Sequence, residues 1–171
     1  MPSIQKSPAP QNALIHKYTS MLGAYTDSYL TVIPVQVSFS EYVYAFYTTP
    51  LFKLERLILK LFVLKPSTDS QVRELADGIR EQFAAWTVED RSENQILMCD
   101  FAGSTRSWLM TLPKEGGTCL YFGSAVVPHR ISKDGKSSLG FFFQALLGFH
   151  KIYSVLLLYS AKSRLMRQIK K

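Results

Sequence analysis

The spacing of hydrophobic residues changes twice along this chain. In the stretch SYLTVIPVQV, residues 28–37, apolar and polar side chains alternate, which predicts a strand. The residues expected to share one face of it are Thr31, Ile33, Val35 and Val37. Pro34 lacks an amide N–H, so we expect this strand at a sheet edge or with a bulge.

A helical period follows, between residues 38 and 78. Ser38 with Glu41 and Thr68 with Gln71 have the spacing of capping boxes, which begin helices. Gly78 is the expected stop of the last helix. The expected helices span about 39–47, 51–65 and 69–77.

After residue 82 the period returns to two. Four stretches read as strands, at 82–90, 94–101, 105–112 and 118–127. The turns between them are short, so neighbouring strands are expected to be antiparallel and to form a meander. A polar loop then leads to a long apolar helix.

That helix, around LGFFFQALLGFHKIYSVLLLYS at 139–160, is long enough for a membrane span, yet Lys151 lies near its middle. On a helical wheel Gln144, Lys151 and Lys162 fall on one line. A membrane span gives no reason for such a line. We therefore expect a core helix that lies across the sheet, with the line of Gln144, Lys151 and Lys162 exposed to solvent.

The order of elements predicts an α+β fold. One strand, two to three helices, a meander and a long C-terminal helix form a sheet whose apolar face needs a cover, and only the last helix is long enough for it. Residues 1–24 are expected to be a disordered or partly helical tail, and residues 25–171 a single domain.

Composition narrows the class of protein. The chain has 171 residues, 47% of them hydrophobic, which supports a sizeable core. The net charge is +7, and five cations lie in the last ten residues: Lys162, Arg164, Arg167, Lys170 and Lys171. A basic tail of this kind interacts favourably with the negative C-terminal end of a helix. The two alternative interpretations are that it binds anionic lipid or nucleic acid. No nucleic-acid motif is present, so we expect no nucleic-acid partner.

The cysteines and histidines give no sign of a metal or cofactor. Cys99 and Cys119 do not have metal-ligand spacing, and His16, His129 and His150 are scattered. We therefore expect no metal and no cofactor. No secretory signal opens the sequence, and free thiols fit a cytoplasmic setting.

Three stretches carry a resemblance to a known family. FAGSTRSWLM, FGSAVVPHR and LGFFFQALLGFHKIYSVLLLYSA resemble the end of an uncharacterised bacterial domain family related to the START and Bet v 1-like helix-grip (SRPBCC) superfamily. The resemblance covers residues 25–165. It implies a curved sheet of one N-terminal strand plus a four- to six-strand meander around the C-terminal helix, with an apolar pocket between them. The chain shows four strands after the helices where six is common, which leaves the size of that pocket open.

Aromatic and charged residues are candidates to line this pocket. They are Tyr44, Tyr47, Trp86, Asp100, Arg106, Trp108, Tyr121, Phe149, His150 and Tyr153. The alternative is that the aromatic residues simply pack. The family brings no catalytic residue to this sequence, and a histidine on an apolar helix flank is more often structural than catalytic.

Asp100 and Arg106 flank a short turn and are expected to lie opposite each other. Two interpretations stay open: an exposed cross-strand pair of small energetic value, or a charged pair in the pocket. Arg106 shares a strand face with Trp108. If that face points inward, the arginine favours an acidic amphiphile.

Three functions remain from the sequence. The first is a soluble protein that binds a small hydrophobic or amphipathic molecule without chemistry. The second is a cyclase- or dehydratase-like enzyme that uses the same pocket. The third is a peripheral membrane protein that uses Lys53, Arg56, Lys60 and the basic tail. The oligomeric state is open.

Overall fold

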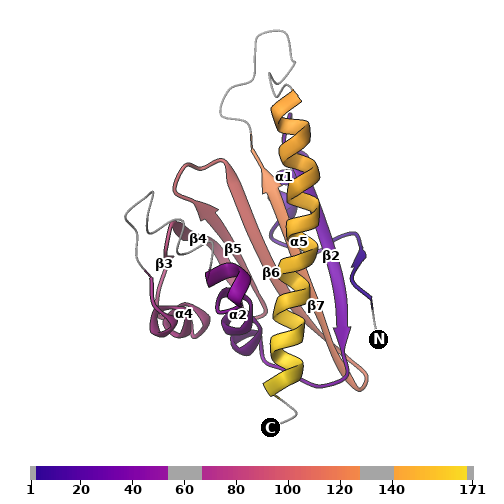
Figure 1. Ribbon diagram of the computed structural model, residues 1–171, viewed down its shortest axis with the longest axis vertical. Coiled ribbons are helices and arrows are strands. Elements are labelled where there is room, and N and C mark those ends of the chain that lie inside the picture. Colours follow the sequence, from indigo (N-terminus) through magenta and orange to yellow (C-terminus); the bar gives the residue numbers. More distant parts are fainter. Residues whose placement is uncertain (1–2, 54–66, 128–140, 169–171) are drawn as a thin grey trace.

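The computed structural model of the protein describes residues 3–53, 67–127 and 141–168, except for the side chains of 141–151. Within these residues, seven strands form one antiparallel sheet (Figure 1). They are β1 (Gln5–Lys6), β2 (Tyr25–Ile33), β3 (Gln82–Phe83), β4 (Trp86–Ser92), β5 (Gln95–Asp100), β6 (Thr105–Lys114) and β7 (Gly117–Val126). Their order across the sheet is β1-β2-β7-β6-β5-β4-β3, so the first long strand pairs with the last.

Two helices between β2 and β3 begin at the predicted capping boxes. The amide of Glu41 donates to Ser38 Oγ over 3.2 Å at the start of α2 (Phe39–Tyr47). The amide of Gln71 donates to Thr68 Oγ1 over 3.2 Å at the start of α4 (Asp69–Ala76). Of the helix predicted over 51–65, residues 51–53 are helical, and the rest lies outside the described residues.

The strands agree with the predicted meander, with two differences. The strand predicted over 82–90 is divided into β3 and β4 at Ala84, whose φ of 53° interrupts the extended backbone. The strand predicted over 28–37 begins earlier, at Tyr25, and ends at Ile33, because Pro34 has no amide N–H to continue the ladder. Among the described residues, only the two of β1 pair with β2 on that side of the sheet, so β2 lies next to an edge.

The C-terminal helix α5 (Phe141–Gln168) lies along β2 and β7 (Figure 1). We call the side of the sheet toward α5 the inner face. There Leu158, Ala161 and Leu165 of α5 share one core with Ile33 and Leu109 of the sheet. Helices α2 and α4 contribute to the same core. A curved antiparallel sheet packed on a long C-terminal helix is the predicted helix-grip arrangement, which the structure confirms.

A second core lies on the opposite side of the sheet, which we call the outer face. Residues 3–24, the N-terminal segment, include β1 and α1 (His16–Thr19). Side chains of this segment pack on the outer face, and the buried members of this core are Ala13, Ile15, Tyr18, Leu97, Trp108, Met110 and Ala125. The placing of a domain boundary at residue 24 stays a prediction.

Gly123 of β7 lets the N-terminal segment approach closely. A Cβ at this position would lie 2.8 Å from the Trp108 ring and 3.1 Å from Ile15 Cδ1. Both distances are below ordinary van der Waals contact. The missing side chain therefore makes room for Ile15 over the sheet.

The prediction that the polar line on α5 is exposed to solvent is wrong for Lys162. Its ammonium donates to Thr31 Oγ1 on β2 over 3.1 Å, and burial lowers the pKa of the lysine. A lysine stem can lie along an apolar surface while its end finds a polar partner, which the wheel alone does not show. Gln144 and Lys151, the other members of the line, have side chains outside the described residues.

The exposed side of α5 carries apolar side chains instead. Ile152, Leu156 and Tyr159 are 63%, 47% and 59% exposed, and their spacing places them on one line along the helix. Among the helices that the structure describes, none has both the length and the apolar character needed to cross a membrane.

Two leucines of α5 provide a test of this packing. Leu158 is fully buried and Leu156 is about half exposed. Leu158→Ala should lower the free energy of unfolding by roughly 2–5 kcal/mol, because it leaves a cavity in the inner core. Leu156→Ala is the matched control and should change it by about 0.5 kcal/mol or less. Urea denaturation measures both, and equal losses would contradict the orientation of α5.

Candidate functional site

The inner face changes from apolar to polar along the strands. One row across the sheet, in register, consists of Tyr29, Phe122, Leu109 and Ile96. Two residues further along each strand, on the same face, the row consists of Asp27, Ser124, Ser107 and Met98. We call this second set the inner polar row. Asp27, Ser124 and Ser107 are only 4%, 2% and 8% exposed, so a carboxylate and two hydroxyls are buried side by side.

Hydroxyl groups surround the carboxylate of Asp27. Ser124 Oγ donates to Oδ1, and the hydroxyls of Tyr25 and Tyr29 donate to Oδ2 over 3.4 and 3.5 Å. The two tyrosine contacts are at the long limit of a hydrogen bond. Within the described residues, no lysine, arginine or histidine forms an ion pair with Asp27. The carboxylate therefore has capacity to accept a closer or a charged donor.

The neighbouring tyrosines stay protonated. Burial, and after it the nearby charge of Asp27, raises the pKa of Tyr29 to about 12, and raises the pKa of Tyr25 in the same way. Both phenols therefore act as hydrogen-bond donors at neutral pH. The sequence signal for this cluster was a carboxylate in phase with the apolar positions of β2, at Asp27 between Tyr25 and Tyr29.

Four of the predicted pocket residues lie on the inner side. Tyr47 is fully buried, with its ring centroid 5.2 Å from that of Phe46. Tyr44, Trp86 and Tyr153 are partly buried against the same core. The Tyr44 ring lies 3.9 Å from the Arg73 guanidinium carbon. Within the described part of the chain these aromatic residues pack against the core, and their role as pocket residues stays a prediction.

Three other predicted pocket residues lie on the outer face. Arg106 and Trp108 do share a strand face, but it points away from α5, while Leu109 points toward it. Trp108 Nε1 donates to Gln95 Oε1 over 2.9 Å, and Tyr121 packs 6.1 Å from the indole. Placing these residues under the helix is therefore wrong. Both faces of β6 are apolar, so alternation alone could not say which one meets α5.

The predicted contact between Asp100 and Arg106 is also wrong. Arg106 lies opposite Cys99, one position away. Asp100 accepts hydrogen bonds from the amides of Ser104 and Thr105, over 2.8 and 3.2 Å, and so closes the turn. An aspartate commonly bonds to the backbone of its own turn, and this preference outweighs a cross-strand pair.

Phe149 and His150, the remaining predicted pocket residues, lie in α5 with side chains outside the described residues. Their role stays a prediction.

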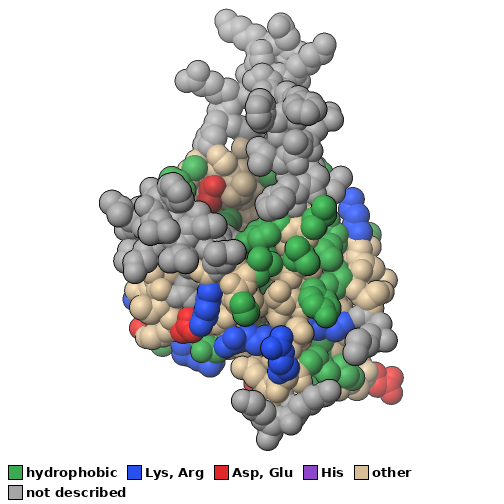
Figure 2. Space-filling view, viewed as in Figure 1, with side chains coloured by type: hydrophobic (Ala, Val, Ile, Leu, Met, Phe, Trp, Pro, Cys, Tyr) green, Lys and Arg blue, Asp and Glu red, His purple; other side chains and the backbone are tan. Residues whose placement is uncertain are grey.

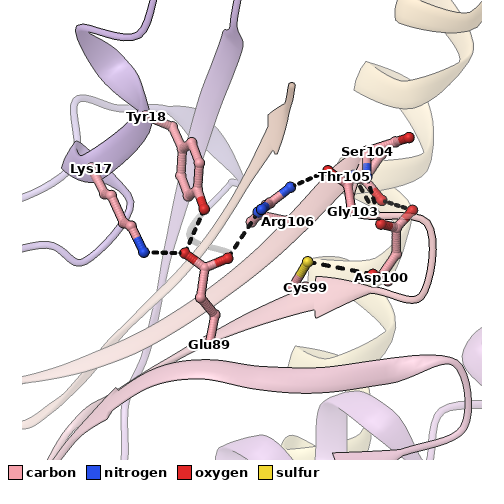
Figure 3. A network of polar contacts seen from close by, with 9 residues as sticks. All are labelled: Lys17, Tyr18, Glu89, Cys99, Asp100, Gly103, Ser104, Thr105 and Arg106. Atoms are coloured by element: carbon pink, nitrogen blue, oxygen red, sulfur yellow. Dashed lines mark hydrogen bonds and ion pairs between the residues drawn. The ribbon is translucent and has the colours of Figure 1, made fainter. Parts of the chain in front are cut away.

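Arg106 instead belongs to a network around Glu89, which the sequence did not indicate (Figure 3). Glu89 accepts hydrogen bonds from Lys17 Nζ over 2.5 Å, from the Tyr18 hydroxyl and from Arg106 Nε over 3.0 Å. The Arg106 guanidinium also lies 4.8 Å from the centre of the Tyr18 ring. Since Lys17 and Tyr18 belong to α1, this network holds the N-terminal segment on the sheet.

The network predicts a dependence of stability on pH. Burial alone would raise the pKa of Glu89, but the hydrogen bonds from Lys17, Tyr18 and Arg106 outweigh it and lower that pKa. A carboxyl whose pKa is lower in the folded state stabilises the fold above its unfolded pKa, and loses this effect as pH falls through the folded pKa. Glu89→Gln should therefore cost roughly 1–3 kcal/mol at pH 7, with a difference from wild type that shrinks in acid.

Urea denaturation at a series of pH values measures this difference. Glu93 is exposed on the neighbouring turn, so Glu93→Gln is the control and should follow wild type throughout. A Glu89→Gln deficit that is constant with pH would contradict the charged network.

The described residues hold no group of three or more His, Cys, Asp or Glu side chains placed to bind a metal. Cys99 and Cys119 are free and partly buried. Burial raises the pKa of the Cys99 thiol, which disfavours the reactive thiolate.

Comparisons with known proteins leave the family open. No family model matches the chain, and no curated protein matches it. Among solved structures, CalU16 from Micromonospora echinospora is similar at 12% sequence identity, over 96% of this chain and 92% of that chain, with a TM-score of 0.33. The fold assignment rests on the strand order and helix packing described above.

Proposed function

We propose that this protein binds a small, mainly apolar molecule between the sheet and α5, and that Asp27 accepts a hydrogen bond from an ammonium or hydroxyl group of that molecule. The supporting observation is the inner polar row, a buried carboxylate with two serine hydroxyls beside an apolar face. Binding sites commonly combine apolar walls with a few polar groups that orient the ligand.

The chemistry of Asp27 sets the preference for a donor. A buried carboxylate loses its hydration, and hydroxyl donors replace only part of it. Its two tyrosine donors are 3.4 and 3.5 Å away, so an ammonium or a hydroxyl at a shorter distance would add a charge-assisted bond. The sequence favoured an acidic ligand only if Arg106 pointed into the pocket. In the structure Arg106 lies on the outer face and forms an ion pair with Glu89. A carboxylate on the ligand would instead face the like charge of Asp27.

A matched set of probes tests this preference. We expect 1-naphthylmethylamine to bind about ten- to a hundredfold more tightly than 1-naphthoic acid, since a charge-assisted hydrogen bond has that value. Asp27→Asn should remove the preference, because the amide keeps the shape and loses the charge. Isothermal titration calorimetry measures both affinities.

The control is Asp77→Asn, at an exposed carboxylate that lies at the end of α4 and bonds to Ser40. It should keep the preference for the amine, and circular dichroism should show the wild-type fold in both variants. Equal affinity for amine and acid in the wild type would overturn the proposal, as would the absence of binding by either probe.

The enzyme alternative required a titratable pair at the pocket. Arg106 and Asp100 do not form that pair, because Arg106 bonds to Glu89 and Asp100 closes a turn. Asp27 and its hydroxyl neighbours bind and orient a donor in the proposed function, and no reaction is assigned to them.

Attachment to an anionic membrane surface is a second candidate function, favoured by the exposed line of α5. Ile152, Leu156 and Tyr159 present apolar side chains, and Figure 2 shows apolar side chains gathered on this face above a group of Lys and Arg. A groove of about 800 Å³ on the same side includes Leu156, Tyr159 and Arg167. Apolar residues beside cations suit an anionic lipid interface.

Vesicle co-sedimentation tests this attachment. The wild type should bind vesicles containing phosphatidylserine more than pure phosphatidylcholine, and less at high salt, because added ions screen the basic groups. Leu156→Glu should weaken binding at least about fivefold, since it puts a negative charge in the apolar line. Leu156→Ile is the control that keeps the line apolar. Binding that ignores both lipid charge and salt would contradict this function.

A further inference from the structure

A cavity of about 480 Å³ lies on the outer face, between β2 and the N-terminal segment. Its buried floor includes Ile15 and Ser28, and its walls include Pro8, Ala9 and His16. Every residue around it belongs to the described part of the chain. This volume lies within the range of small-molecule sites. Of the inner polar row, Asp27 is among the residues that line the cavity.

Ser28 has a hydroxyl without a partner at this cavity. The residue is 7% exposed, and its Oγ is buried with no hydrogen bond. Its backbone carbonyl is engaged, since it accepts from the Ser7 amide over 3.0 Å. A buried hydroxyl without a partner is rare in folded proteins. Because Ser28 is one of the residues that line the cavity, a bound group that reaches its hydroxyl would complete it.

The other groups around the cavity define the chemistry of the ligand. The surface is mostly apolar, from Pro8, Ala9 and Ile15. His16 Nε2 donates to the Pro10 carbonyl over 2.8 Å and so is already used. The carboxylate of Asp27 bonds to Ser124 on the inner face, so its charge is directed away. Lys6 also lines the cavity, but it is exposed, so water screens its charge and an ion pair with it would contribute little to binding. The apolar surface therefore favours a neutral ligand.

We propose that this outer cavity is a second binding site, for a neutral, compact aromatic or alicyclic molecule with one oxygen that bonds to Ser28 Oγ. The apolar body of the molecule lies against Ala9 and Ile15, and its oxygen lies at the floor. This site is separate from the proposed function, because its ligand lies on the opposite face of the sheet. Asp27 lines both sites, but its carboxylate bonds to Ser124 on the inner face.

Para-cresol and toluene are matched probes, since they differ by one hydroxyl. Para-cresol should bind the wild type about three- to tenfold more tightly than toluene, the value of one neutral hydrogen bond. Ser28→Ala should bring the two affinities together, with the affinity for toluene unchanged or higher. Chemical-shift titration by NMR measures both affinities and locates the shifts around β2 and α1.

Two variants serve as controls. Ser154 of α5 is also buried with an unpartnered hydroxyl, far along the chain and on the inner side, so Ser154→Ala should keep the preference for para-cresol. Ala9→Leu fills the cavity and should weaken both probes. Equal binding of the two probes to the wild type would overturn the proposal. So would binding of neither probe, which would mean that an ordered water alone satisfies Ser28.

Asp27→Asn separates this site from the proposed function. The variant should lose the preference for the amine at the inner face and keep the preference for para-cresol at the outer cavity. Loss of both preferences would show that the two probe sets report one site, and would overturn the second site.

Discussion

The pairing of β2 with β7 determines which side chains meet on each face of the sheet, and most of the structure depends on it. Nine residue pairs, from Tyr25 with Val126 to Ile33 with Thr118, join strands from the two ends of the sheet-forming sequence. Because successive side chains alternate between faces, this register alone decides that Asp27 and Ser124 meet on the inner face. A shift by one residue would place Ser28, Leu30 and Val32 under α5 and bring the Asp27 carboxylate to the outer face.

The sheet is covered on both faces, and this explains which predictions held. Local signals were sufficient for α2, α4 and the meander, since capping boxes, Gly78 and short turns act over a few residues. The cover of each face depends on contacts between distant segments. Trp108 and Leu109 are adjacent and both fully buried, one under the N-terminal segment and the other under the helices. No period in the sequence distinguishes these two kinds of burial.

The candidate site was missed for the same reason. Asp100 and Arg106 flank a short turn, and Arg106 shares a strand face with Trp108, so the sequence indicates them as candidates for a pocket pair. In the structure Asp100 instead bonds to the backbone of its own turn, and Arg106 bonds to Glu89. Asp27 becomes informative only once its strand is paired, because its burial follows from Ser124 on β7, almost a hundred residues away in the sequence. Residues that meet across a sheet can be predicted only when the register is known.

The N-terminal segment has a consequence for how the protein can be shortened. It covers Trp108, Leu97 and Met110, and β1 pairs with the edge of β2 that does not contact β7. A fragment that starts at Tyr25 would expose this apolar surface and also the part of the β2 edge, at Tyr29 and Leu30, that β1 covers. Exposed apolar surface and open strand edges promote association with other molecules, so such a fragment would be prone to self-association. In the full chain the N-terminal segment therefore protects the protein against self-association, and it also forms one wall of the outer cavity.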